Sequence, residues 1–224
     1  MAAVRNSREP HKGRQDLTRF LRTENSDIEI TSYKVKDLGR EYIELLTDLN
    51  QACFPPCTRE DCRSDITERS NIVHVAAYKG TGLPVGLAGE MTVMEGGQKC
   101  AYLSFAAVAE SERGKGVYQQ LAYARIMNAV SRGIMLVRVD TQNANIEYGI
   151  RKILDKIVSE GHIGGYEISR QIEPGRMQHY GVGRVAGDAP VKSKSDQLNR
   201  EYEVLDVDRG DGFNITIRLA TKKS

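Results

Sequence analysis

The sequence predicts a mixed α/β (α+β) fold, in which a mostly antiparallel central sheet of six to seven strands is flanked by about four helices. Strand-like runs separated by turn signals occupy residues 71–110. Further along, apolar residues recur at three- and four-residue steps, which is typical of helices packed on a core. The order strand, helix, strand, helix over residues 100–161, with short links, indicates a right-handed crossover and one parallel strand pair.

The first elements are expected between residues 28 and 67. Residues 28–35 alternate apolar and polar side chains, as a strand with one exposed face does. An amphipathic helix should follow over 37–53, with Asp37 as its N-cap and Pro55 and Pro56 ending it. A short second helix is expected to start at Thr58.

The middle of the chain predicts a hairpin followed by a crossover. Runs at 71–80 and 83–94 are separated by a glycine-containing turn, and residues 95–99 turn the chain into a strand over 100–110. A helical stripe then ends at Gly133; its members are Val117, Leu121, Ala124, Met127 and Val130. The apolar run 134–140 predicts a strand covered on both faces.

The last third predicts one helix, two strands and a long loop. Isoleucines at helical spacing mark residues 143–161, and strands are expected at 164–172 and 212–220. Residues 173–211 are rich in Gly, Lys, Asp and Ser and predict a loop-rich insertion. We expect a single domain over 27–224, preceded by a flexible basic N-terminal arm over 1–26.

Composition argues against several classes of protein. The 224 residues contain 32 basic and 30 acidic side chains, so the chain has no general affinity for polyanions. Phe20 is the one aromatic residue in the arm, which makes nucleic acid an unfavoured partner. No run approaches the ~20 apolar residues of a membrane span, and the N-terminus lacks the apolar core of a secretory signal. The expected location is the cytoplasm, with no membrane partner.

Three of the four cysteines, Cys53, Cys57 and Cys62, lie close together in "CFPPCTREDC". Zinc sites usually combine closely spaced cysteine pairs with further ligands at matching spacing. No histidine follows within the next ten residues, so we expect reduced thiols and no metal.

The stretch "ESERGKGVYQQL", residues 110–121, places two glycines at the expected start of a helix. Free backbone N–H groups and the helix dipole make such a position a natural site for a phosphate. A P-loop is excluded because Gly116 follows Lys115 where Ser or Thr is required. A dinucleotide fingerprint is incomplete because Gln119 replaces its third glycine. A plain glycine-containing helix start with no chemical role is the remaining structural alternative.

The run "VAESERGKGVY", residues 108–118, resembles the coenzyme A signature of the Gcn5-related N-acetyltransferase (GNAT) superfamily. Val108, Arg113 and Gly116 fall in register with that signature. Glu110 replaces its usual proline, and Tyr118 replaces its final small residue. The predicted element order from 28 to 170 also matches the family, so the resemblance covers about two thirds of the chain.

The resemblance implies acetyl-CoA as co-substrate and no metal. Amides of residues 114–119 would hold the pyrophosphate, and the backbone of the preceding strand would hold the pantetheine. Lys115 would be a solvated cation near the phosphates. The implied binding residues are Ala106, Ala107, Val108, Arg113, Gly114, Lys115, Gly116, Val117, Tyr118 and Gln119.

Three residues are candidates for the proton transfers of acyl transfer to an amine. Glu90 is the first candidate for the base, the alternative being a strand residue that faces solvent. Tyr102 is a second candidate and, with Ser104, could line the acceptor pocket or simply be packed. The family's acid is a tyrosine whose matching position here is Ile157, so Tyr148 on the same helix is the substitute. His74, placed among apolar strand residues, is expected to be a core histidine.

The expected function is that of an acyl-CoA-dependent N-acyltransferase, which moves acetyl from acetyl-CoA to a primary amine of a small molecule or peptide. The alternative is a catalytically weak or inactive protein of the same fold that binds CoA or a partner, with nucleic acid reached through the basic arm. Truncation of residues 1–22 would separate the two. A homodimer is compatible with either reading.

Overall fold

The computed structural model describes residues 27–55, 57–177 and 192–222. Its strands are β1 (Ile28–Lys34), β2 (Ile72–Tyr78), β3 (Pro84–Glu95), β4 (Gln98–Val108), β5 (Leu136–Thr141), β6 (Gly165–Glu173) and β7 (Gly212–Ala220). Its α-helices are α1 (Arg40–Cys53), α2 (Arg59–Thr67), α3 (Val117–Ser131), α4 (Ala144–Ser159) and α5 (Asp196–Tyr202). Two short 3-10 helices, η2 (Val35–Asp37) and η3 (Glu110–Glu112), complete the described elements.

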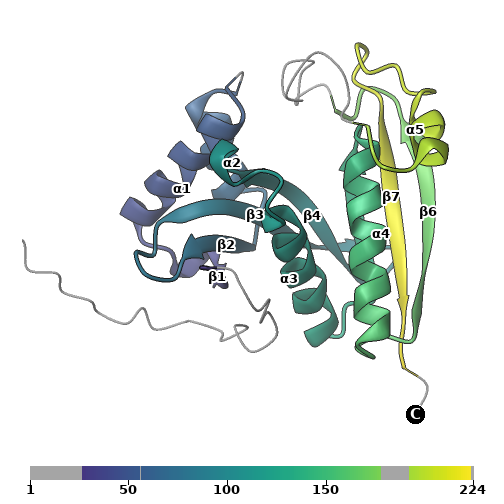
Figure 1. Ribbon diagram of the computed structural model, residues 1–224, viewed down its shortest axis with the longest axis horizontal. Helices are drawn as coiled ribbons and strands as arrows, with labels where there is room; N and C mark the ends of the chain where they lie inside the picture. The colour runs from purple at the N-terminus through teal and green to yellow at the C-terminus, as the bar shows by residue number, and fades with distance from the viewer. Residues whose placement is uncertain (1–26, 56, 178–191, 223–224) are drawn as a thin grey trace, which may run out of the picture.

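The strands form one seven-stranded sheet in the order β1-β2-β3-β4-β5-β7-β6, with helices on both faces (Figure 1). Neighbouring strands are antiparallel except β4 and β5, which are parallel and are joined through α3. The predicted mixed, mostly antiparallel fold and its one pair of neighbouring parallel strands are therefore confirmed.

Three hydrophobic clusters bind the helices to the sheet. On one face, Leu46 of α1 and Ile66 of α2 pack against β2, β3 and β4. On the other face, Val117 and Leu121 of α3 pack against β1, β2 and β3. The largest cluster joins α3, α4 and α5 to β4, β5 and β7. Strand side chains alternate between these faces, which explains the period-two pattern of the sequence.

The sheet opens between β4 and β5. The two strands pair only at Cys100 with Leu136, Ala101 with Val137, and Tyr102 with Arg138, although β4 continues to Val108. Beyond Tyr102 they diverge, and the left and right halves of the molecule in Figure 1 separate along this V-shaped opening. Tyr102 therefore stands at its apex.

An extra residue in β4 lies beside the apex. Gly89 of β3 is opposite Phe105, whereas Met91 is opposite Tyr102, so one residue of β3 lies opposite two of β4. This arrangement is a β-bulge at Leu103–Ser104, a feature that bends a strand and can end its pairing.

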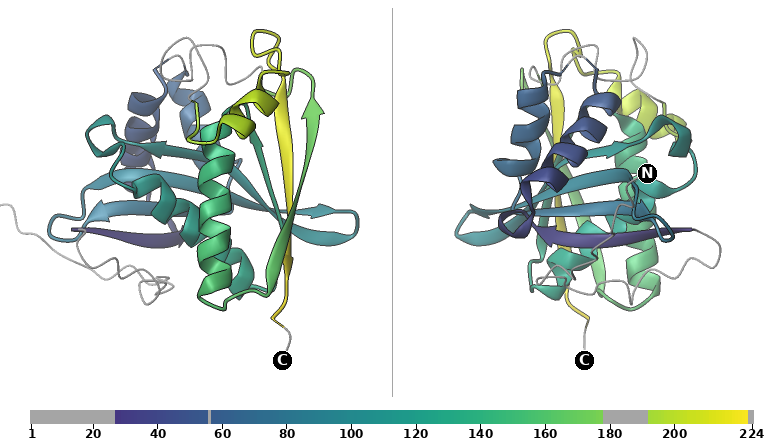
Figure 2. Two further views of the ribbon diagram at one scale, coloured as in Figure 1. Left: turned by 45° about the vertical axis from the view of Figure 1, so that its right-hand side comes forward. Right: turned by 90° about the vertical axis from the view of Figure 1, so that its left-hand side faces the viewer.

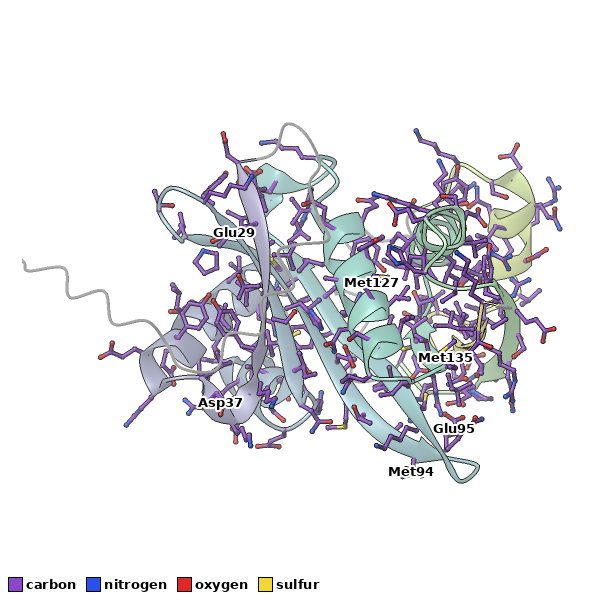
Figure 3. The ribbon with its side chains drawn as sticks, turned by 90° about the horizontal axis from the view of Figure 1, so that it is seen from below. Glu29, Asp37, Met94, Glu95, Met127 and Met135 are labelled. Carbon is purple, nitrogen blue, oxygen red and sulfur yellow. The ribbon has the colours of Figure 1, made fainter. Side chains whose placement is uncertain are left out.

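The β3–β4 hairpin forms a long projection at the other end of these strands. It reaches past β6 and β7 in the left-hand view of Figure 2. Met94 and Glu95 mark its tip in Figure 3, and Met94 is largely exposed.

Some local expectations need correction, and others lie outside the described residues. Asp37 does not cap α1, because it belongs to η2 and the N-cap is Gly39, which makes no side-chain cap bond. The second helix does start at Thr58, which is its N-cap and accepts a hydrogen bond from the Asp61 amide. The expected loop at 173–211 contains α5, while 178–191, Pro56 and the arm 1–26 lie outside the described residues.

β5 was expected to be an apolar strand covered on both faces. Leu136, Val137 and Val139 are buried, and the last two join the core shared with α3 and α4. The alternate positions, Arg138 and Asp140, carry charges on the opposite side of the sheet. Asp140, on this polar side of β5, belongs to the candidate site described below.

Candidate functional site

The connection from β4 to α3 is an open, glycine-containing turn. Gly116 is the N-cap of α3 with φ +82°, and Gly114 has φ +78°, both in the left-handed region that favours glycine. A Cβ atom placed on either glycine would meet no other heavy atom within 4 Å. The backbone here is thus accessible to a ligand from the outside.

The same turn presents backbone donors. The first N–H groups of a helix have no intrahelical acceptor, and the first helical bond here runs from the Gln120 amide to the Gly116 carbonyl at 3.1 Å. Gly116 supplies no capping side chain for the amides that precede Gln120. Together with the positive end of the α3 dipole, these amides form a site suited to a phosphate. The residues present therefore fit the CoA pyrophosphate implied by the signature.

Glu112 stabilises the turn through hydrogen bonds to two side chains. Its largely buried carboxylate accepts hydrogen bonds from the Tyr78 hydroxyl at 2.8 Å and from Lys115 Nζ at 3.1 Å. The Tyr78 hydrogen bond, followed by that of Lys115, lowers the pKa of Glu112. Lys115 is mostly exposed, as expected, but it is ion-paired with Glu112.

The backbone of β4 has a free edge along the opening. The Ala109 amide bonds to the Val85 carbonyl, and antiparallel alternation then turns the backbone groups of Ala107 toward β3 and those of Ala106 and Val108 toward the opening. Arg113 Nε donates to the Val108 carbonyl at 3.2 Å. Cys53 lies there too: burial raises the pKa of its thiol, while Arg113 and the Val108 backbone act in the opposite direction.

Tyr118 connects the two helices beside the opening. A Cβ built on Gly149 of α4 would lie 3.6 Å from the Tyr118 ring, so the large residue of α3 faces a small one of α4. Burial raises the pKa of Tyr118, and neighbouring Arg125 opposes that effect. Arg125 is itself buried and donates to the Phe105 carbonyl at 3.2 Å. Tyr118 replaces the small residue of the signature, and Gly149 leaves room for its larger side chain.

A hydrogen-bonded pair occupies the apex of the opening. The Tyr102 hydroxyl donates to Asp140 Oδ2 at 2.8 Å. The carboxylate also accepts from Asn214 Nδ2 at 2.8 Å and from Arg176 Nε at 2.9 Å. Asp140 and Arg176 were not among the predicted residues, although an acidic residue that ends the otherwise apolar run of β5 was a usable signal.

Glu90 lies elsewhere, in a sealed network on the α3 face of the sheet. It has no exposed surface, so the solvent-facing alternative is wrong. His74 Nε2 lies 3.2 Å from its Oε2, Asn128 Nδ2 donates to the same oxygen at 2.8 Å, and Arg132 ion-pairs with Oε1. On the other side of the ring, Ser32 Oγ lies 2.8 Å from His74 Nδ1, which makes His74 the expected satisfied core histidine.

Tyr148 is also separate from the opening. It lines a cavity between α4, β6 and α5, and Lys152 lies 4.9 Å above its ring. Ser104 contacts Ser70 at 3.2 Å on the side of the sheet that carries α1 and α2. Of the three catalytic candidates, the structure thus brings only Tyr102 to the apex of the opening.

Among the described residues, no group of three or more His, Cys, Asp or Glu side chains is arranged to hold a metal ion. None of the four cysteines, all of which lie in the described part of the chain, forms a disulfide. None of the described helices is long and apolar enough to cross a membrane.

Comparison with known proteins agrees with this geometry. Residues 40–148 match the acetyltransferase (GNAT) family, a segment that includes the glycine turn, the bulge and the apex. This segment, just under half of the chain, belongs to the GNAT family. No curated protein sequence matches the chain significantly.

Solved structures have the same fold as this chain. One is a chain in the crystal structure of the NatC complex bound to Gag peptide and CoA, with a TM-score of 0.54 and 14% identity over 87% of this chain and 100% of that one. Another is the ribosomal-protein-S18-alanine N-acetyltransferase from Escherichia coli, with a TM-score of 0.51 and 13% identity over 88% and 97% of the two chains. At these identities the likeness concerns the fold. Acyl-CoA acetyl transfer follows at the level of the family.

Proposed function

We propose that this protein is an N-acyltransferase that moves acetyl from acetyl-CoA to a primary amine of a small molecule or peptide. The observation that carries the proposal is the alignment of an open donor turn, a free β4 edge and the Tyr102–Asp140 pair along one opening in the sheet. Bound acetyl-CoA would supply the activated acyl thioester. The remaining tasks fall to the protein.

Binding is assigned to the backbone. The amides of residues 114–119 would hold the pyrophosphate, and the edge groups of Ala106 and Val108 would hold the pantetheine. Arg113 now donates to the Val108 carbonyl, so this side chain must move for that carbonyl to accept from a ligand. Tyr118 would act as a wall of the opening through its contact with α4.

Proton handling is assigned to Tyr102 with Asp140. An amine must lose a proton as it is acylated, and a positioned side chain at hydrogen-bond distance accelerates such a transfer. The Tyr102 hydroxyl is at the apex and is oriented by a carboxylate on the neighbouring strand. Glu90, paired at both oxygens within the α3 interface, is better suited to holding that helix in place.

Calorimetric titration with acetyl-CoA, followed by a thiol-release assay over panels of amines and short peptides, tests the proposal. We expect acetyl-CoA to bind and at least one panel to release free thiol. Absence of acetyl-CoA binding at 1 mM ligand, about 4 kcal/mol of affinity, would refute the assigned site. Binding without thiol release from any panel would favour the catalytically inactive alternative.

A further inference from the structure

Asp140 is a buried carboxylate whose partners differ in how firmly they are held. Its side chain is 3% exposed, and it is contacted by Tyr102 of β4, Asn214 of β7 and Arg176. The first two are strand residues within the sheet. Arg176 instead reaches in from a turn, and its side chain is 43% exposed. It is therefore the one of these three partners that approaches from solvent.

The turn that carries Arg176 is held by contacts of the residues on either side of it. The Met177 amide bonds to the Gly210 carbonyl at 2.8 Å, and the Gly175 amide donates to Asp211 Oδ1 at 3.2 Å. Met177 also packs so closely on Gly212 that a Cβ there would lie 2.6 Å from its side chain. Because both neighbours of Arg176 are anchored, its flexible side chain can leave Asp140 without a change in the backbone.

Arg176 offsets part of the negative charge that surrounds Asp140. Arg138 lies between 3.5 and 3.7 Å from three carboxylates, those of Glu95, Asp140 and Glu173. Arg176 contacts two of the same carboxylates, Asp140 at 2.9 Å and Glu173 at 3.4 Å. If Arg176 turned away, three carboxylates would face a single guanidinium. The vacated position would attract another cation.

We propose that Arg176 occupies the place of the acceptor's ammonium group, and that the acceptor of this enzyme is a cationic amine that displaces it from Asp140. This inference rests on the proposed function, because the displaced position lies beside Tyr102 at the apex of the opening. The exchange replaces one N–H donor with another on the same oxygen, so the buried carboxylate keeps a cationic partner throughout. Anionic amines would be excluded by the carboxylates that remain.

Chemical rescue of Arg176→Ala tests this directly, with n-butylammonium chloride as the probe. The variant leaves Asp140 without its mobile partner, and we expect its melting temperature to fall. A ligand at ten times its dissociation constant raises the Tm of a domain of this size by about 3–6 °C. We therefore expect n-butylammonium, titrated to 50 mM, to raise the Tm of Arg176→Ala by at least about 3 °C more than the same concentration of sodium chloride.

Three controls make the result specific. The double variant Arg176→Ala with Asp140→Asn should show no rescue. The wild-type protein, in which Arg176 competes for Asp140, should show a smaller shift at the same concentration. Arg59→Ala, which breaks an exposed ion pair with Glu44, measures any general effect of the ammonium. Equal shifts in all of these proteins, or none in Arg176→Ala, would overturn the proposal. If Arg176→Ala does not fold, Arg176→Gln, which retains a polar amide, replaces it with the same expected rescue.

The rescue requires neither acetyl-CoA nor turnover, so its outcome is separate from that of the proposed function. Rescue in a protein that fails to bind acetyl-CoA would keep the cation site and reject the acyltransferase assignment. Acetyl-CoA binding without rescue would keep the assignment and reject the role of Arg176.

Discussion

Replacing Gly116 with valine tests the phosphate-binding turn, because two separable effects are expected. At φ +82° a residue with a side chain is strained by about 1–2 kcal/mol. For a domain of this size that strain lowers the Tm by about 2–8 °C. A Cβ here meets no atom within 4 Å, so no steric clash is added in the free protein. The new side chain instead projects into the space in front of the α3 amides.

Acetyl-CoA binding should therefore suffer beyond the loss of stability. We expect the dissociation constant of Gly116→Val, measured by calorimetry, to rise more than tenfold, which corresponds to about 1.4 kcal/mol or more. Gly133 provides the matched control because it has φ +70°, no atoms within 4 Å of its Cβ position, and a place just beyond the other end of α3. Gly133→Val should lose similar stability but bind normally. Wild-type affinity in Gly116→Val would refute the assignment.

Three further outcomes are expected. Tyr102→Phe should lower kcat at least tenfold with acetyl-CoA affinity unchanged, whereas Tyr166→Phe, which removes a similar phenol–carboxylate bond at 2.6 Å to Asp155, should leave kcat unaltered. Glu90→Gln should lower the Tm by more than about 3 °C while the shape of the pH–rate profile stays that of wild type; loss of the acidic limb of the profile would restore Glu90 as the base. Burial, with the charges of Arg125 and Arg132, lowers the pKa of His74 to about 3 from about 6.5 in the unfolded chain. Between these pH values the unfolded chain therefore binds more protons than the folded protein. The free energy of unfolding should fall on acidification through this range, by up to ~1.4 kcal/mol per pH unit. Denaturant midpoints of His74→Asn measured from pH 6.5 to 4.5 should show a shallower slope than wild type, and equal slopes would contradict this origin.

The sequence predicted most elements because their patterns depend on neighbouring residues. The stripe of α3 and the alternation of β7 each record one buried face, and both elements appear where expected. Asp37 failed as a cap because the tight turn of η2 intervenes before α1. The helix α5 was missed because its seven residues provide fewer than two full turns of periodicity within a polar segment.

The candidate site was only partly predictable. The residues of its glycine turn are adjacent in the sequence, whereas the residues at the apex of the opening are far apart in it. Gly114 and Gly116 mark the turn within three residues. In contrast, Tyr102, Asp140 and Arg176 come from β4, β5 and a later turn, and single-sequence patterns carry no information on that proximity. The same reason made Glu90 look isolated, since its partners belong to β2 and α3.

The extra residue at Leu103–Ser104 also determines which face of the sheet the side chains of β4 reach. With strict alternation, Leu103 and Phe105 would point to the same side of the sheet, yet Phe105 packs under α1 and α2 while Leu103 joins the α3 and α4 core. The extra residue thus reverses which alternate side chains of β4 face each side of the sheet, so the two halves of the strand pack against different helices. Insertions or deletions in this strand should be far less tolerated than substitutions, because each would invert the inside and the outside of everything downstream.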